Sequence, residues 1–286
     1  MTRASLLLGT MLAFAGICGA ALWSAAGDRP AAAERPQRIV SLNLCADQLV
    51  LALADREQIV GLTRNAADPE MSGEAAKAKG LRILTNSAEE ILELDPDLVV
   101  GIPARRSASI SVLKGQNYNM LDLKTANTLD EIYASIRETA AAVRHPERGA
   151  ALIATMDKQL AAIPRPGAGR VAAYYQRRGF MTGTGTLIDD LMTRVGVVNL
   201  AAKLGKPALS QLRLEEMVAA EPDFLIVESA TDTVTDQGSE MLHHPALKDI
   251  PRISIPQAWT VCGSPAYTMA ARSMADQIAD YPARAR

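Results

Sequence analysis

The sequence has no marked excess of charge of either sign. Its 30 lysines and arginines nearly balance 32 aspartates and glutamates, so the formal net charge is −2 and the pI is near 6.0. A nucleic-acid-binding protein would need a basic stripe to neutralise phosphates, so we exclude nucleic acid as a partner. Charged residues make up 22% of the chain and hydrophobic residues 48%, which is typical of a globular protein and excludes general disorder.

The sequence also lacks the short motifs of common enzymes. There is no Gly-x-Ser-x-Gly nucleophile elbow, and Gly183-Thr184-Gly185 is too short for a phosphate-binding loop. Histidine is scarce, with only His145, His243 and His244. Two adjacent histidines rarely ligate one ion together, which disfavours a zinc site. We therefore expect no catalytic residues, no resident metal and no cofactor.

Long hydrophobic runs are absent except at the N-terminus. Arg3 precedes an apolar run from Leu6 to Trp23, and small residues follow it. This pattern is typical of a secretory signal peptide, which we assign to residues 1–26, with cleavage as late as residue 33 as an alternative. The run approaches the length of a membrane span, so an uncleaved anchor is the other alternative. Ile17 before Cys18 does not fit a lipoprotein box, so we expect no lipid attachment.

Cysteine is scarce as well. Removal of the signal leaves Cys45 and Cys262, in a chain that is then exported to an oxidising compartment. A disulfide is chemically permitted there. The sequence does not show that these two residues are close in space.

What the chain does contain is an internal repeat. Residues 88–100 and 214–226 match in register, each with paired acids, an apolar pair, acid-Pro-Asp and an apolar run. Between them, Pro146 to Ile163 is predicted as one helix, because Pro146 and Glu147 suit a first turn and the apolar residues recur at helical spacing. A helix of about 18 residues spans roughly 27 Å and could join two similar halves as a stiff strut.

Short apolar strands alternate with helices in each half. In the first half we expect strands at 38–42, 59–62, 97–100 and 118–123, and helices at 45–54, 87–94, 107–114 and 129–143. In the second we expect strands at 170–175, 224–227 and 252–255, and helices at 187–195, 213–220 and 265–279.

This order predicts an α/β fold with two lobes, 37–145 and 168–286, whose sheets are mostly parallel and which the rigid helix 146–163 joins. Ligands of open parallel sheets lie beyond the carboxyl ends of the strands. The loops of both lobes should therefore face one ligand cleft between them.

Several of these features together resemble one known family. They are Arg38-Ile39-Val40-Ser41-Leu42-Asn43 to Gly61-Leu62, the two Glu-Glu…Pro-Asp lines, Gly185-Thr186-Leu187-Ile188-Asp189-Asp190-Leu191 with Gly196 and Asn199, and the linking helix. The set is similar to the periplasmic binding proteins of the cobalamin and ferric-siderophore transport family, and it covers about Gln37 to Ala279. The resemblance implies two lobes that hold a ligand and deliver it to the permease of an ABC importer in the inner membrane.

The resemblance also implies how the protein docks. Members of this family present one acidic residue at the tip of each lobe to arginines of the permease, and the repeat places these residues at Glu89 and Glu215. Exposed acids at matching positions would steer association with a basic partner. The alternative is that each acid merely favours its helix N-terminus, by roughly 0.3–1 kcal/mol.

The chain departs from the family pattern in two places. Gly196-Val197-Val198-Asn199 lacks the usual small residue after the glycine, and cysteines follow the first and last strands. A Cys45–Cys262 disulfide would bridge the lobes and restrict their opening. Free thiols near the ligand, or cysteines that contact a bound metal complex, are the alternatives.

Candidate ligand residues follow the predicted strands. The arginines are Arg64, Arg105, Arg106, Arg177 and Arg178, and the clustered aromatic residues of the second lobe are Tyr174, Tyr175, Phe180, Trp259 and Tyr267. Arginine forks suit the oxygens of an anionic ferric chelate, and flat apolar rings suit a large chelated ligand. Neighbouring residues of a strand point to opposite faces, so one of Tyr174 and Tyr175 should belong to the core.

We therefore predict a monomeric periplasmic protein that captures a ferric siderophore or a similar metal chelate. Cobalamin is the alternative ligand. The alternative of another class is a chelatase or a metal-cluster enzyme subunit of similar bilobal fold, which would not need the N-terminal signal.

Overall fold

The computed structural model describes residues 35–85, 87–102 and 118–281, which belong to one compact unit that begins at Arg35. The predicted signal peptide, the predicted helix at 107–114, and Arg105 and Arg106 lie outside the described residues. Among the described residues, no helix is both long enough and apolar enough to cross a membrane.

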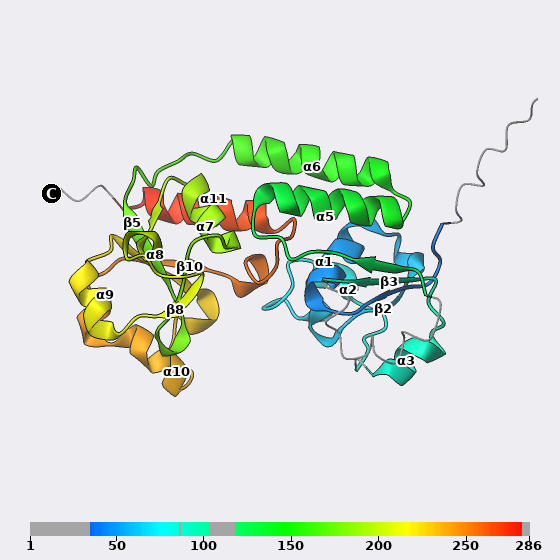
Figure 1. Ribbon diagram of the computed structural model, residues 1–286, viewed down its shortest axis with the longest axis horizontal. Helices are drawn as coiled ribbons and strands as arrows, with labels where there is room; N and C mark the ends of the chain where they lie inside the picture. The colour runs from blue at the N-terminus through cyan, green and yellow to red at the C-terminus, as the bar shows by residue number, and fades with distance from the viewer. Residues whose placement is uncertain (1–34, 86, 103–117, 282–286) are drawn as a thin grey trace, which may run out of the picture. The chain divides into compact units, whose positions relative to one another are not determined.

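The first half of the chain forms a parallel sheet with strand order β2-β1-β3-β4 (Figure 1). Its elements are β1 (Ile39–Ser41), α1 (Leu44–Leu53), β2 (Ile59–Gly61), α2 (Ala75–Ala78), α3 (Ala88–Glu93), β3 (Leu98–Gly101), β4 (Met120–Asp122) and α5 (Leu129–Ala142). Polar side chains begin the longer helices: Asn43 accepts a hydrogen bond from Ala46 N at α1, and Thr128 accepts one from Glu131 N at α5. The predicted strands of this half are all present.

The second half forms a mixed sheet with strand order β10-β9-β5-β6-β8, and β7 also pairs with β5. Its elements are β5 (Val171–Tyr175), β6 (Phe180–Thr182), α7 (Leu187–Arg194), β7 (Val198–Asn199), α8 (Leu200–Lys203), β8 (Leu209–Gln211), α9 (Leu214–Ala220), β9 (Phe224–Glu228), α10 (Gln237–Glu240), β10 (Arg252–Ile255) and α11 (Tyr267–Ala279). Strands β10, β9, β5 and β7 pair in parallel, as the predicted fold class requires.

Strands β6 and β8 pair antiparallel and were not expected from the sequence. The chain reverses between β5 and β6 through Arg178 and Gly179, which both have positive φ, and Gln176 N then donates to Phe180 O at 2.7 Å. Each of these two strands has only three residues, and β8 is mostly exposed. Strands this short lack a hydrophobic alternation long enough to read from the sequence.

The internal repeat has a structural cause. Asp97 accepts hydrogen bonds from the backbone N–H groups of Gln37 and Arg38 ahead of β1, and Asp223 accepts one from Val171 N at the start of β5. The acid-Pro-Asp line thus ties the start of β3 to β1 and the start of β9 to β5. Asp95 and Glu221, the acids before the two prolines, both have positive φ. The two acid-Pro-Asp lines of the repeat therefore form the same type of backbone turn, once in each half.

The central parallel strands of each sheet, β1 and β3 in the first and β5 and β9 in the second, are buried on both faces. In the second sheet, Ala172, Tyr174 and Ile226 face α7 and α11 in the largest apolar cluster, whereas Tyr175 and Val227 belong to a separate cluster on the opposite face. The largest cluster also contains buried residues of β1, β3, α1 and α5 from the first half. One continuous core therefore joins the two sheets.

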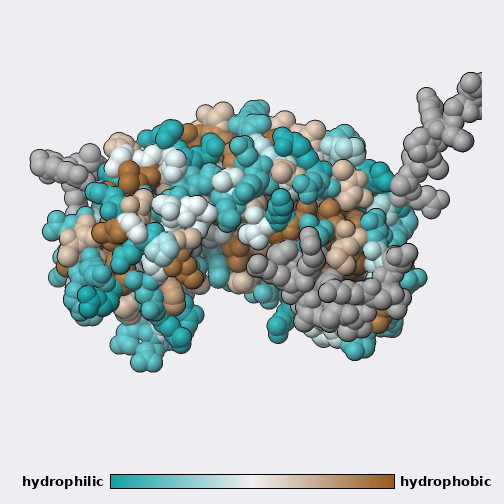
Figure 2. Space-filling model, in the orientation of Figure 1, coloured by the Kyte–Doolittle hydropathy of each residue, from teal (hydrophilic) through white to brown (hydrophobic). Residues whose placement is uncertain are grey.

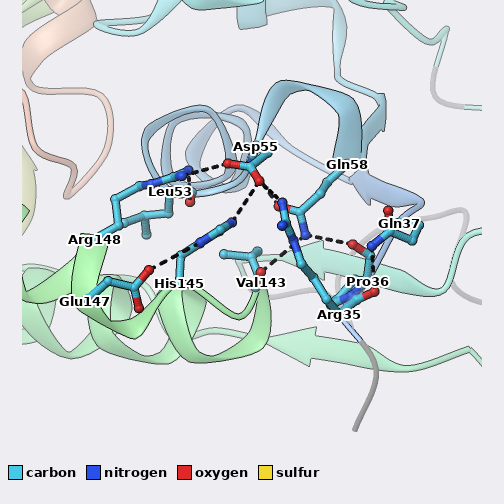
Figure 3. Close-up of polar contacts among 10 residues, drawn as sticks. All are labelled: Arg35, Pro36, Gln37, Leu53, Asp55, Gln58, Val143, His145, Glu147 and Arg148. Atoms are coloured by element: carbon cyan, nitrogen blue, oxygen red, sulfur yellow. Dashed lines mark hydrogen bonds and ion pairs between the residues drawn. The ribbon is translucent and has the colours of Figure 1, made fainter. Parts of the chain in front are cut away.

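Helix α6 (Pro146–Ala161) links the halves and packs against both α5 and α11 (Figure 1). A polar cluster fixes its first turn at the end of α1 (Figure 3). Arg148 Nη2 lies 2.7 Å from Asp55 Oδ1, and Arg148 Nη1 donates to Leu53 O at 2.7 Å. Arg35 also pairs with Asp55, and His145 Nε2 lies 3.2 Å from its Oδ2. The start of α6 is thereby anchored to the first half.

Candidate functional site

A cavity of about 330 Å³ lies beyond the carboxyl ends of parallel strands from both sheets. Its lining comprises Cys45, Ile102, residues 124–127 and Ser135 of the first half, and Tyr174, Gln176, Thr182, residues 186–188, Glu228, Gln257 and residues 260–263 of the second. The volume is at the lower end of the range usual for small-molecule sites. The position agrees with the rule that places ligands at strand carboxyl ends.

A row of hydrogen-bonded side chains crosses one wall of the cavity. Tyr174 Oη and Gln176 Nε2 each donate to Glu228 Oε1 at 3.2 Å. Thr182 Oγ1 in turn donates to Gln176 Oε1 at 3.3 Å. These residues come from the ends of β5, β6 and β9, three strands of one sheet, so the position of the Glu228 carboxylate is set by the sheet itself.

Tyr174 is a hydrogen-bond donor at this wall. Its side chain is only 3% exposed. Burial, and then the negative charge of Glu228, raise the pKa of Tyr174 far above its usual value, so the phenol keeps its proton. Tyr175, the next residue, points to the opposite face, where its hydroxyl donates to Leu212 O at 2.8 Å. Tyr174 therefore belongs to the cavity and Tyr175 to the core.

A disulfide between Cys45 and Cys262 forms part of the cavity wall. It joins the first turn of α1 to the segment that follows β10, and therefore the first half of the chain to the second. Between the two halves, Leu129 N at the start of α5 also donates to Asp190 Oδ1 of α7 at 3.2 Å. The two halves are thus tied to one another covalently as well as by packing.

The other described residues expected at the ligand lie outside the cavity lining. Arg64 is exposed, and Arg177 forms an ion pair with Asp236. Tyr267 is fully buried, with its hydroxyl between Asp190 and Arg194. Trp259 packs half-buried against the main core, although its neighbours Gln257 and Thr260 line the cavity. The rule that ligands lie at strand ends therefore holds for Tyr174, which lines the cavity, but not for these other side chains. Segments that follow a strand can turn away from the edge of the sheet.

Sequence reasoning missed the polar residues that do line the cavity. Glu228, Gln176 and Lys124 follow strands β9, β5 and β4 directly or closely, so the same rule of strand ends could have found them. In the part of the cavity that the structure describes, Glu228 and Lys124 are the charged residues.

The paired acids of the repeat have different surroundings. Glu90 accepts hydrogen bonds from Thr85 N and Thr85 Oγ1, and Glu216 accepts them from Arg213 N and Arg213 Nε. These contacts lower the pKa of both carboxyl groups. Glu89 and Glu215, one residue earlier in each helix, are exposed on α3 and α9, and no described residue bonds to either carboxylate.

The three histidines have separate partners. His145 belongs to the Asp55 cluster, His243 Nε2 lies 2.8 Å from Thr231 O, and His244 Nδ1 accepts from Ala246 N. Among the described residues, no three His, Cys, Asp or Glu side chains are grouped so that they could hold a metal ion.

Comparison with known proteins shows similarity to one family and to several of its relatives. The sequence model of the family described as periplasmic binding protein matches residues 39–253. A cobalamin-binding protein of Halobacterium salinarum is 24% identical over 213 residues, which are 72% of this chain but only 58% of that protein. A vitamin B12-binding protein of Pectobacterium atrosepticum is 24% identical over 263 residues, which are 86% of this chain and 89% of that one.

Among solved structures, a periplasmic heme-binding protein from Roseiflexus sp. RS-1 in its apo form is similar, with a TM-score of 0.68 and 26% identity. The similarity covers 85% of this chain and 98% of that one.

Proposed function

Because this chain belongs to the periplasmic binding protein family, we propose that it is the substrate-binding component of an ABC importer. It captures a metal chelate in the cavity and hands it unaltered to a permease in the inner membrane. The observation that carries the proposal is the cavity of about 330 Å³ whose walls come from both halves of the chain, beyond the carboxyl ends of their strands.

The proposed ligand is a ferric siderophore or a similar metal chelate. The relatives support the broad class, because their names include cobalamin and heme, which are both metal chelates. The second candidate is cobalamin itself, which the names of two relatives favour. Arg64 and Arg177 do not line the cavity, so neither of these two arginines supports an anionic chelate.

The proposed site of action is the periplasm, where the protein works as a monomer after removal of residues 1–26. The family match and the N-terminal sequence pattern support this localisation. Mass spectrometry of the protein from a periplasmic extract should find an N-terminus at residue 27 or as late as residue 34. A chelatase or metal-cluster enzyme would instead stay in the cytoplasm and retain residues 1–26.

Glu89 and Glu215 are the proposed contacts with the permease. Both are exposed in the first turn of a helix, and their neighbours Glu90 and Glu216 already make the hydrogen bonds to the preceding backbone. The helix starts therefore do not need Glu89 or Glu215 as caps. Figure 2 shows a mostly hydrophilic surface around α9 and α10, which suits a contact made by charge rather than by apolar burial.

The ligand class can be tested by titrating the mature protein with ferric siderophores, heme and cobalamin. Trp259 reports binding, because it lies between two cavity residues, Gln257 and Thr260, in the chain. We expect saturable quenching by one class of chelate. Absence of quenching and of any shift in thermal stability with every chelate would refute the proposed cargo and leave the fold unaffected.

The docking residues can be tested by charge reversal. Glu89→Lys together with Glu215→Lys should abolish uptake of the chelate by cells and leave its binding affinity unchanged, since neither residue lines the cavity. The matched control is Glu138→Lys with Asp276→Lys, which reverses two exposed acids on α5 and α11. Equal loss of uptake in both double variants, or loss of affinity in the first, would contradict the docking assignment.

A further inference from the structure

Side chains of the described residues donate hydrogen bonds to only one oxygen of the Glu228 carboxylate. Both neighbouring donors, Tyr174 Oη and Gln176 Nε2, bond to Oε1 at 3.2 Å. No described residue bonds to the second oxygen, Oε2. A carboxylate has about four lone-pair positions and accepts hydrogen bonds only, so Glu228 retains acceptor capacity at the wall of the cavity.

The support behind Glu228 is rigid. Tyr174 is 3% exposed and lies in the central strand of the second sheet, and Gln176 is held by Thr182. Glu228 itself ends β9, which pairs with β5 and β10. A carboxylate fixed in this way cannot turn away from a ligand that fills the cavity, whereas a side chain on a free loop could.

Among the described residues that line the cavity, no cation is paired with this carboxylate. Lys124 also lines the cavity, but its side chain is exposed and the structure shows no ion pair between it and Glu228. Charges in contact with water are screened, so Lys124 contributes little directional attraction. The other described lining residues are neutral hydroxyl, amide, backbone or apolar groups.

We propose that Glu228 determines which chelates are bound by requiring an N–H group, from an amide, amine or ammonium, against its free oxygen. This inference rests on the proposed function and narrows its ligand class. A bound chelate removes water from the carboxylate, and a buried carboxylate without a new donor is unfavourable. A carboxylate or catecholate edge placed against Glu228 would instead add repulsion between like charges, so an anionic edge is disfavoured at this position.

Two matched pairs of ligands test this inference on the mature protein. Ferrioxamine B carries a free ammonium group, whereas its N-phthaloyl derivative is neutral and has no N–H at that end, although the iron centre is the same. Cyanocobalamin carries amide side chains, and each of its monocarboxylic acids has one amide replaced by a carboxylate. The two pairs distinguish a siderophore from a corrinoid as the source of the N–H group.

The variant is Glu228→Gln, whose amide oxygen can still accept from Tyr174 and Gln176. The control is Glu240→Gln, which removes one exposed negative charge on α10, away from the cavity. In the wild type we expect the ammonium or amide member of one pair to bind about tenfold more tightly, the usual difference between a charged and a neutral hydrogen bond. Glu228→Gln should abolish this preference and keep affinity for the neutral ferrioxamine or the monocarboxylic acid. Glu240→Gln should change neither.

The outcomes separate this inference from the proposed function. Tight binding without any preference within a pair, or a preference that survives in Glu228→Gln, would overturn the role of Glu228 and uphold a chelate-binding protein. Failure of both pairs and of heme to bind would overturn the proposed function together with this inference. A thermal melt of each variant near that of the wild type shows that a loss of preference does not come from unfolding.

Discussion

Replacement of both Cys45 and Cys262 by serine should lower the melting temperature by about 10 °C without loss of the fold. The disulfide joins residues 217 positions apart in the sequence, from the start of α1 to the segment after β10. The native contacts between the halves do not depend on it. Helix α6 still packs against α5 and α11, and Asp190 still accepts from Leu129 N.

The magnitude follows from the unfolded state. A cross-link over so long a loop removes about 18 cal/mol/K of chain entropy from the unfolded ensemble, which is about 5 kcal/mol at 25 °C. Unfolding entropy of roughly 2.1 cal/mol/K per residue amounts to about 0.5 kcal/mol/K for a chain of about 250 residues. Division of the first quantity by the second gives the expected fall of about 10 °C.

The assay is a set of thermal melts followed by circular dichroism. The wild type is measured with and without a phosphine reductant, and so is the Cys45→Ser/Cys262→Ser variant. Reduction of the wild type and the double substitution should give the same melting temperature, and the reductant should not affect the variant. A fall of less than about 3 °C by either route would refute the entropic reasoning.

Three further changes test other parts of the fold. Burial raises the pKa of Asp47 to about 6, so the folded state holds a proton that the unfolded state releases near pH 4. The free energy of unfolding of the wild type, relative to that of Asp47→Asn, should therefore fall by roughly 3 kcal/mol at most as the pH rises from about 4 to 6. Urea unfolding of both proteins across this pH range measures the difference, and a difference that does not change with pH would contradict the prediction. In Gly183→Ala the new Cβ would clash with the backbone oxygen of Pro207, so a loss of roughly 1–3 kcal/mol is expected in urea unfolding. An unchanged unfolding midpoint would contradict the clash. Arg148→Ala removes the half-exposed pair with Asp55, so urea unfolding should show a loss of roughly 1 kcal/mol, and an unchanged midpoint would show that the pair does not anchor α6.

The elements that the sequence predicted best are those with long, regular patterns. Helix α6 begins at Pro146 because a proline needs no hydrogen-bonded N–H in a first turn, and that reason is local. The paired acid-Pro-Asp lines predicted two related halves, and Asp97 and Asp223 show the shared cause, since each accepts a backbone hydrogen bond from a neighbouring strand. The antiparallel strands β6 and β8 escaped prediction because three residues carry no readable period.

The candidate site was harder to predict than the fold. Alternation on a strand indicates that Tyr174 and Tyr175 face opposite ways, but it does not tell which of them faces the cavity. Arg177 follows the same strand and pairs with Asp236 outside the cavity lining. The side chain that fixes the cavity wall, Glu228, meets Tyr174 and Gln176 from a strand more than 50 residues further along the chain.

Local patterns in the sequence were sufficient to determine the alternating α/β elements, their duplication and the helix between them, because caps, prolines and apolar spacing act within a few residues. The tertiary structure alone decided that Cys45 meets Cys262, which of two neighbouring tyrosines faces the cavity, and that the Glu228 carboxylate stands at its wall. These outcomes depend on how strands far apart in the chain pair side by side. Such pairing is set by the packing of the whole core, which no short stretch of sequence contains.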